Sequence, residues 1–281
     1  LIELGIPFSD PTAEGPVIQA ANIRALSGGV TTDKIFAMVE KIRKNTQIPM
    51  VFMTYANVVF SYGTERFIKK ASELGMDGLI LPDVPYEEKE EFDSVCKKYD
   101  MDVIMTSKDG ACLIDRLYEL SNKIEADYYI SINGDEPLIE NEIIPNVIPK
   151  EANNQEPVVQ GLMREFRDPV EVIDPGNMKI VTNNEGYALY ISRSPIPYPH
   201  KTAEYTYKKY VGVECYNKAA LDFYANKKAG YLEKIEDLGT LRFLENGIKV
   251  HYSLVESDSL SVDTSRDLEK VRDKMKQRLG G

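Results

Sequence analysis

The chain has 281 residues, of which 43% are hydrophobic and 28% charged, so it is long enough for one large α/β domain or two smaller ones and too apolar to be disordered. Lys and Arg number 34 against 45 Asp and Glu, and the net charge of −11 argues against general nucleic-acid binding because it repels phosphate backbones. The sequence has no apolar run of about 18 residues to span a membrane and too few cysteines for a disulfide framework, and a cytoplasmic location is expected.

Apolar runs alternate with segments of helical periodicity in the N-terminal part of the chain. Strands are expected at residues 1–6, 48–54, 78–81 and 103–105. Helices are expected from residue 17 to Gly28-Gly29, over residues 35–42 with Thr31 or Thr32 as the cap, over 65–74 and over 86–99. Strands that alternate with helices of about a dozen residues predict right-handed βαβ units around a parallel sheet.

The same alternation continues after residue 100 with less regular spacing. A helix over residues 113–124 is expected to precede a strand at 128–132 and an acidic turn at 133–137. Residues 149–177 are polar and weakly periodic, which predicts a long loop. Further strands are expected at 179–181, 187–191, 211–216 and 250–255, with helices over 235–244 and from residue 266 onward.

Two glutamates near the start of the chain form a candidate catalytic pair. Glu3 lies in the first expected strand and Glu14 in the loop that follows it, and two carboxylates near the end of one strand can divide proton transfer between them. The alternative is that both are solvated acids at a strand end. The run LIELGIPFSDPTAEGP at 1–16, with YAN at 55–57 and LPDVP at 81–85, resembles the tryptophan synthase α chain family over residues 1–100.

This resemblance implies a partial TIM barrel of the (βα)4 type and a lyase activity. In the family, the residue at Glu3 is the general acid/base that cleaves indole-3-glycerol phosphate to indole and glyceraldehyde 3-phosphate. The residue at Glu14, usually Asp, stabilises positive charge on the indole nitrogen. The loop from Pro7 to Pro16 resembles the surface by which α chains dock on a tryptophan synthase β chain, which is therefore an expected partner.

Four motifs follow in order after residue 100. They are TSKD at 106–109 with DRL at 115–117, INGDEPLI at 132–139, GYALYISRSPIP at 186–197, and SVDT at 261–264 with DLE at 267–269. In this order, over residues 101–281, they resemble the 3-deoxy-manno-octulosonate cytidylyltransferase family. Enzymes of this family join a sugar acid to CMP. The resemblance implies a Rossmann-like α/β segment of the nucleotide-diphospho-sugar-transferase type.

The expected chemistry of this second segment is metal-assisted. A sugar oxygen attacks the α-phosphate of CTP, and Mg²⁺ neutralises charge on the phosphates as pyrophosphate leaves. The resemblance makes Asp135 and Asp263 the metal ligands and Arg193 a partner for the substrate carboxylate. Taken alone, the run Gly-Asp-Glu-Pro is also typical of an ordinary turn.

The second segment departs from its family at several positions. Cys112-Leu113 stand in place of Ser-Gly, Asn133 in place of Gln, Tyr210 in place of His, and Gly239-Thr240 in place of Glu-Gln. These differences affect the expected contacts to the base and favour a different sugar acid as the acceptor.

The two segments together resemble a fusion in which neither carries the phosphate-binding loops of its own family. We therefore expect a cytidylyltransferase-like protein of impaired turnover, fused to an α-chain fragment. Two alternatives stay open: a tryptophan synthase α-type lyase, and a non-catalytic chimera or an artefact of joining two genes. The domains are expected to be residues 1–100 and 101–281.

Overall fold

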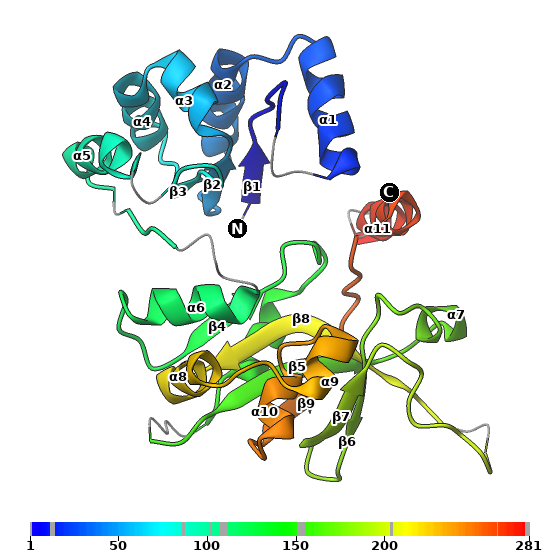
Figure 1. Ribbon diagram of the computed structural model, residues 1–281. Helices are drawn as coiled ribbons and strands as arrows, with labels where there is room; N and C mark the ends of the chain where they lie inside the picture. Colours follow the sequence, from blue (N-terminus) through cyan, green and yellow to red (C-terminus); the bar gives the residue numbers. More distant parts are fainter. Residues whose placement is uncertain are drawn as a thin grey trace. The chain divides into compact units, whose positions relative to one another are not determined.

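The computed structural model describes residues 2–11, 15–85, 88–101, 103–106, 112–150, 155–202, 205–262 and 264–278. The chain divides into two compact units, Leu1–Lys108 and Asp109–Gly281 (Figure 1). Each unit has its own hydrophobic core and is described by itself. Within the described ranges, every helix is too short or too polar to cross a membrane.

The first unit is built on three parallel strands in the order β1-β2-β3. The strands are β1 (Ile2–Gly5), β2 (Met50–Met53) and β3 (Gly78–Ile80). The helices are α1 (Pro16–Ser27), α2 (Thr32–Arg43), α3 (Ala56–Tyr62), α4 (Thr64–Glu73) and α5 (Glu90–Lys98). Leu4 pairs with Phe52, which in turn pairs with Leu79. The parallel βαβ arrangement predicted for this part is confirmed.

Three phenylalanines from different elements form the centre of this unit. Phe36 of α2, Phe52 of β2 and Phe67 of α4 are fully buried and meet edge to face, with ring centroids 5.2 to 5.9 Å apart. The sheet itself does not close, and Ile2 and Ile80 on its outer strands are 40% and 42% exposed. The unit is therefore an open (βα) segment, as a partial barrel requires.

Two expectations for the first unit are wrong. Residues 103–106 are described and form no strand. The helix α3 was not expected, because the residue that satisfies its first turn lies outside the helix, in a later loop. The Asp83 carboxylate, from the loop after β3, accepts a hydrogen bond from the Ala56 backbone N–H at 2.9 Å and so satisfies the start of α3.

The second unit contains a six-stranded sheet in the order β7-β6-β8-β5-β9, with β4 paired to β8. Its strands are β4 (Tyr129–Ile132), β5 (Val159–Glu165), β6 (Lys179–Thr182), β7 (Ala188–Ser192), β8 (Lys208–Tyr216) and β9 (Val250–Leu254). The parallel sheet expected from continued βαβ alternation is wrong here: among the described strands, β5 and β9 pair in parallel and the other ladders are antiparallel. The α/β class is confirmed for both units.

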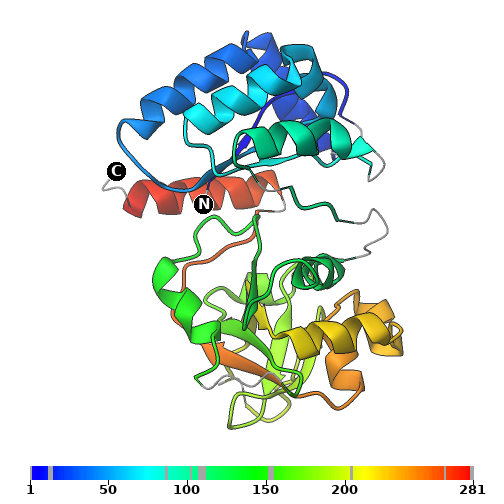
Figure 2. The same cartoon turned by 90° about the vertical axis from the view of Figure 1, so that its left-hand side faces the viewer.

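The helices of this unit are short except for the last one. They are α6 (Leu113–Ser121), the 3₁₀ helix η2 (Asn141–Val147), α7 (Pro169–Val172), α8 (Lys218–Asn226), α9 (Tyr231–Glu236), α10 (Leu241–Glu245) and α11 (Ser265–Arg278). Helices α6 and α8 pack side by side (Figure 1), and Figure 2 shows α11 along its length. The single helix expected over 235–244 is instead two, divided at Asp237, whose φ of 53° is left-handed.

The long loop expected over 149–177 is wrong in part, because it contains the central strand β5. This strand lies between β8 and β9, and Leu162 and Met163 on its opposite faces are both buried. A strand covered on both faces does not alternate in hydrophobicity, which removes the period-2 signal. Gly161 adds a second irregularity: the Tyr252 ring fills the space of its missing side chain, 2.4 Å from an ideal Cβ.

His251 in β9 makes the stability of this unit depend on pH. Its ring lies against Tyr187 with the centroids 5.3 Å apart, and within the described residues its buried Nδ1 has no hydrogen-bond partner. Burial lowers the pKa of His251 below its usual value of 6.5. The unfolded chain then takes up this proton at a higher pH than the folded chain, so stability is complete above about pH 6.5 and falls as the pH drops below it.

We expect His251→Asn to remove part of this acid sensitivity. Urea unfolding at pH 7.5 and pH 5.5 measures the acid sensitivity as the difference between the two free energies of unfolding. This difference should be smaller in the variant than in the wild type. His200, an exposed histidine, provides the matched control, and His200→Asn leaves the wild-type difference in place. An equal loss of stability on acidification in wild type and His251→Asn contradicts the prediction.

Candidate functional site

The turn after β4 presents Asp135 to solvent, and strand β8 fixes its position. The Asn133 backbone N–H donates to the Gly212 carbonyl at 2.7 Å, which continues the β4 ladder into the turn. The pairing of β5 with β8 shifts register opposite Gly161 and Leu162, so Gly212 lies in a bulge. An ideal Cβ on Gly212 would lie 2.7 Å from the Asn133 Cβ, so only glycine allows this close approach.

Glu136, the next residue, points inward and holds the turn. Its carboxylate is buried and accepts a hydrogen bond from the Gly212 N–H at 3.0 Å. It also accepts hydrogen bonds from the hydroxyls of Ser259 and Ser261, the latter at 3.4 Å. The turn of residues 133–136 is thereby tied to the segment before α11, because one carboxylate bonds to both.

This tie brings the two predicted metal-binding segments together. The Val262 N–H donates to the Asp135 carbonyl at 2.9 Å, and Val262 immediately precedes Asp263 in the chain. Asp263 itself lies outside the described residues. Among the residues that the structure describes, no group of three or more His, Cys, Asp or Glu side chains is arranged to hold a metal.

Arg193 follows β7, and its guanidinium is held by backbone carbonyls. Nε donates to the Glu236 carbonyl at 2.7 Å, Nη1 to the Pro175 carbonyl at 3.1 Å and Nη2 to the Asp237 carbonyl at 3.2 Å. The Glu236 carboxylate also accepts from the Arg193 backbone N–H at 2.9 Å. A guanidinium has five N–H groups, so a planar cation fixed in this way keeps one further donor on each Nη.

Lys179 supports Arg193 from within the core. It is fully buried, and its Nζ donates to the carbonyl of Arg193 at 2.5 Å and to that of Asp174 at 2.7 Å. Burial lowers the pKa of this amine, an effect that the nearby Asp174 carboxylate opposes. The lysine therefore joins the loop at Asp174 to the end of β7, and both line the same cavity.

That cavity has a volume of about 320 Å³ and brings most of the predicted site together. Asp135, Arg193 and Lys209 line it, as do Ser261 and Thr264 on either side of the Asp263 region. In all, the lining includes four carboxylates, those of Asp135, Glu136, Asp174 and Asp267, and two cations, Arg193 and Lys209. Such a cavity suits an anionic ligand whose charge is shared with a hard cation.

A second cavity of about 250 Å³ shares the residues Asn133, Met178, Arg193 and Tyr210 with the first. The positions that depart from the cytidylyltransferase pattern meet here: Cys112, Leu113, Asn133, Tyr210, Gly239 and Thr240 all line it. Apolar side chains make up much of its wall, and Glu214 lines it as well. The sequence differences are therefore clustered in space at one ligand-sized opening.

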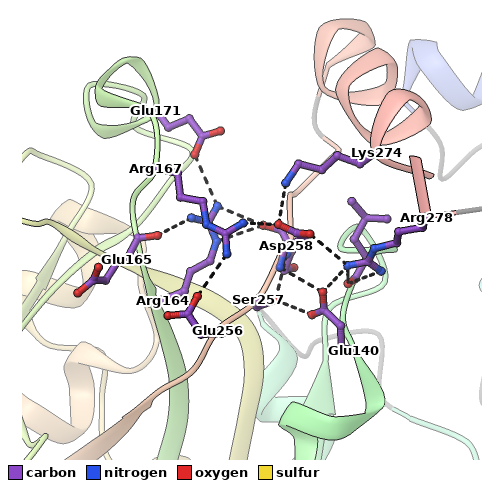
Figure 3. A network of polar contacts seen from close by, with 12 residues as sticks. Glu140, Arg164, Glu165, Arg167, Glu171, Glu256, Ser257, Asp258, Lys274 and Arg278 are labelled. Atoms are coloured by element: carbon purple, nitrogen blue, oxygen red, sulfur yellow. Dashed lines mark hydrogen bonds and ion pairs between the residues drawn. The ribbon is translucent and has the colours of Figure 1, made fainter. Parts of the chain in front are cut away.

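Helix α11 supplies one wall of the first cavity, and a charged cluster fixes its far end (Figure 3). Asp258 accepts hydrogen bonds from Lys274 at 3.0 Å and from Arg167. Arg278 of the last turn pairs with Glu140. The hydrogen bond from Lys274, and after it the one from Arg167, hold the pKa of Asp258 below its usual range. These contacts determine where Thr264 and Asp267 lie at the start of the helix.

The structure gives less support to the predicted catalytic pair of the first unit, Glu3 and Glu14, than to the predicted site of the second unit. Glu3 is an exposed residue of β1, paired in register with Val51. Glu14 lies outside the described residues, as does part of the loop from Pro7 to Pro16. A cavity of about 600 Å³ in this unit is lined by residues of β3 and α5, by Met101 and by residues 103–105, and Glu3 does not line it.

Comparison with known proteins identifies both parts of the chain. The family model described as tryptophan synthase alpha chain matches residues 1–162, and the model described as cytidylyltransferase matches residues 88–250. The chain belongs to both families. The two matches overlap over residues 88–162, and the division between the structural units, at Lys108, falls inside this overlap.

The tryptophan synthase relatives are similar over the N-terminal part only. The tryptophan synthase alpha chain of Lacticaseibacillus casei is 50% identical over 104 residues, 37% of this chain and 39% of that protein. That of Alkaliphilus metalliredigens is 53% identical over 104 residues, with the same coverage. The chain thus spans about two fifths of the length of the curated relatives that it matches.

A solved structure is similar over nearly the whole chain. It is a CMP:2-keto-3-deoxy-manno-octonic acid synthetase complexed with CTP, with 25% sequence identity and a TM-score of 0.58. The similarity covers 99% of this chain and 98% of that chain. This similarity and the match to the cytidylyltransferase model both agree with the resemblance expected for the second segment.

Three acidic residues that line the site or hold its residues in place were not singled out in the sequence. Glu136 lies in the predicted turn, but its inward orientation depends on Gly212 and Ser259, which are distant in sequence. Glu236 holds Arg193 and follows a helical pattern that predicts a surface position. Glu214 sits in an apolar strand, and this local contrast was the one available signal.

Proposed function

We propose that the protein is a cytidylyltransferase-type enzyme that transfers a CMP group from CTP to a 3-deoxy sugar acid. The observation that carries this proposal is the cavity that unites Asp135, Arg193 and the two residues flanking the Asp263 region. The similarity to a synthetase structure that contains CTP supports it. The reaction joins an oxygen of the sugar acid to the α-phosphorus of CTP and releases pyrophosphate.

The oxygen-rich turn at Asp135 fits a magnesium ion. Mg²⁺ binds through one or two carboxylates and completes its shell with water and substrate phosphates. Asp135 is exposed at the cavity and Val262 bonds to its carbonyl, so Asp135 and Asp263 are the residues that would hold the ion. The ion would supply charge neutralisation on the phosphates. Arg193 would bind and orient the carboxylate of the acceptor.

We expect turnover to be impaired. Residues 1–87 lie outside the cytidylyltransferase match and inside the tryptophan synthase match, so a different βα segment stands before the matched region. Catalysis of phosphoryl transfer depends on donors placed around the triphosphate as well as on the metal.

We propose residues 1–100 as the tryptophan synthase-like domain and 101–281 as the cytidylyltransferase-like domain, within a cytoplasmic protein.

The test is Mg²⁺-dependent release of pyrophosphate from CTP in the presence of 3-deoxy-manno-octulosonate. We expect a slow release that requires both the sugar acid and the metal. No release above that of CTP alone would contradict the proposal and favour a non-catalytic chimera. A rate typical of efficient enzymes, above about 10 s⁻¹, would contradict the impairment.

A lyase function is the second candidate, favoured by the identity of about 50% to tryptophan synthase alpha chains. We expect no indole from indole-3-glycerol phosphate, because the described sheet of this unit has three strands and Glu3 does not line the cavity of about 600 Å³ described above. An assay for indole, with Glu3→Gln as the control, checks this. Indole formation that disappears in Glu3→Gln would establish the lyase instead. Co-purification with a tryptophan synthase β chain tests the expected partner of the 7–16 loop.

A further inference from the structure

Three buried cations lie side by side on neighbouring strands of the second unit. Lys209 of β8 pairs in register with Arg164 of β5 on one side and with Lys179 of β6 on the other. Lys209 is 3% exposed, Arg164 4% and Lys179 0%. Residues paired directly across strands present their side chains on one face, where like charges repel each other. Negative charge placed against the middle of this row therefore stabilises it, and Lys209 is the middle residue.

The middle cation is the member of the row that a ligand can reach. Arg164 donates to two backbone carbonyls and forms an ion pair with Glu171 at 3.5 Å (Figure 3). Lys179 likewise donates to two carbonyls. Lys209 lines the first cavity and also a third cavity of about 250 Å³, which Arg266 and Lys270 of α11 line as well.

The charge balance of the first cavity makes each of its cations important, because its wall carries four carboxylates and two cations. Three of the four carboxylates accept hydrogen bonds from backbone N–H groups, those of Glu136, Asp174 and Asp267. The fourth, Asp135, is the proposed metal ligand. A divalent ion together with Arg193 and Lys209 balances the four acids. Without Lys209 the wall would be net negative even with the ion bound, and it would repel a phosphate.

The two cations of this wall suit different parts of a substrate. Arg193 donates to three carbonyls, and the proposed function assigns its remaining donors to the carboxylate of the acceptor. A lysine is a compact charge with three donors, and it binds phosphate oxygens as a point charge. Lys209 shares the first cavity with Asp135, so a phosphate beside a metal ion at Asp135 has this amine as its available cation.

We propose that Lys209 binds the phosphate oxygens of the nucleotide and of the pyrophosphate that leaves. This inference rests on the proposed function, because it assumes a nucleoside triphosphate in the first cavity. It places a phosphate-binding cation inside the matched region 88–250, and so accounts for slow turnover in a chain whose first 87 residues belong to the other match. Lys209 contributes charge and hydrogen bonds and takes no part in proton transfer.

Calorimetry of the full chain with inorganic pyrophosphate and Mg²⁺ tests this proposal. Lys209→Met should bind pyrophosphate about 10- to 100-fold more weakly than the wild type, because a hydrogen bond to a charged group is lost. Lys209→Arg keeps the charge and should bind within about threefold of the wild type. In the pyrophosphate-release assay, Lys209→Met should raise the KM for CTP and leave the KM for 3-deoxy-manno-octulosonate unchanged.

Lys208→Met is the matched control for these measurements. Lys208 is the preceding lysine of β8, lies on the opposite face of the strand and donates to the Thr182 hydroxyl at 3.3 Å. Its replacement should leave pyrophosphate binding unchanged. Wild-type affinity in a folded Lys209→Met, or an equal loss of affinity in Lys208→Met, would overturn the proposal.

Amine acylation followed by mass spectrometry decides the question on the wild-type chain, even if Lys209→Met fails to fold. Pyrophosphate with Mg²⁺ should slow the acylation of Lys209 and leave that of Lys208 unchanged. A chain that releases pyrophosphate from CTP but shows no such protection of Lys209 would overturn this inference alone. A chain that neither binds pyrophosphate nor releases it from CTP would overturn the proposed function as well.

Discussion

Replacing Asp135 with alanine is expected to reduce pyrophosphate release from CTP to the rate seen without protein. The side chain is exposed at the cavity, so its loss removes a metal ligand without opening the core. A bound divalent ion contributes several kcal/mol of charge stabilisation to phosphoryl transfer, and this is the largest single effect that we expect from a surface substitution. The measurement is a coupled pyrophosphate assay over a range of Mg²⁺ concentrations.

Asp127→Ala is the matched control for this experiment. Asp127 is an exposed aspartate just before β4, at the opposite end of the strand from Asp135, and its replacement should leave the rate and the Mg²⁺ dependence unchanged. Retention of Mg²⁺-dependent release in Asp135→Ala would show that the metal binds elsewhere. Equal loss in both variants would point to a general effect of charge on the β4 region.

Glu136→Ala is expected to have the largest effect on stability, a loss of about 2–4 kcal/mol in the free energy of unfolding of the second unit. The buried carboxylate accepts from the Gly212 N–H and the Ser259 hydroxyl, and its removal leaves both donors without this partner. The same change separates the turn of residues 133–136 from the segment before α11. We therefore expect pyrophosphate release to fall with stability.

Urea unfolding followed by circular dichroism measures this change. Glu142→Ala provides the comparison, because Glu142 is an exposed glutamate on η2, a short distance along the chain, and its removal should change stability by less than about 0.5 kcal/mol. A stability loss in Glu136→Ala no larger than that of Glu142→Ala would mean that the buried contacts of Glu136 contribute little.

The sequence predicted most helices and strands whose signals are local. Thr31 was expected as a possible cap, and its hydroxyl accepts from the Lys34 N–H at 3.3 Å at the start of α2. The strand β5 and the helix α3 were not predicted, because their signals depend on partners far along the chain. In β5, Leu162 packs with Ile143 and Val147 of η2 while Met163 belongs to a different core cluster, and in α3 the first turn is satisfied by Asp83.

The site shows the same division between local and distant signals. A motif placed Asp135 and Arg193, and the structure brings both to one cavity. The motif did not reveal that Glu136 would face inward, since Gly212 and Ser259 become its neighbours only when β8 and the segment before α11 have folded. The roles of Asp135, Asp263 and Arg193 as ligands, and of Glu3 and Glu14 as catalytic acids, remain predictions.

The buried position of Lys179 has a practical consequence for chemical labelling. Amine-acylating reagents attack uncharged, accessible amines, and the Nζ of Lys179 is enclosed and engaged by two carbonyl groups. Mass spectrometry of the acylated chain should therefore find this lysine among the slowest to react. Faster acylation at Lys179 would report that the loop at Asp174 has separated from the end of β7, which makes this one amine a sensor of an opened site.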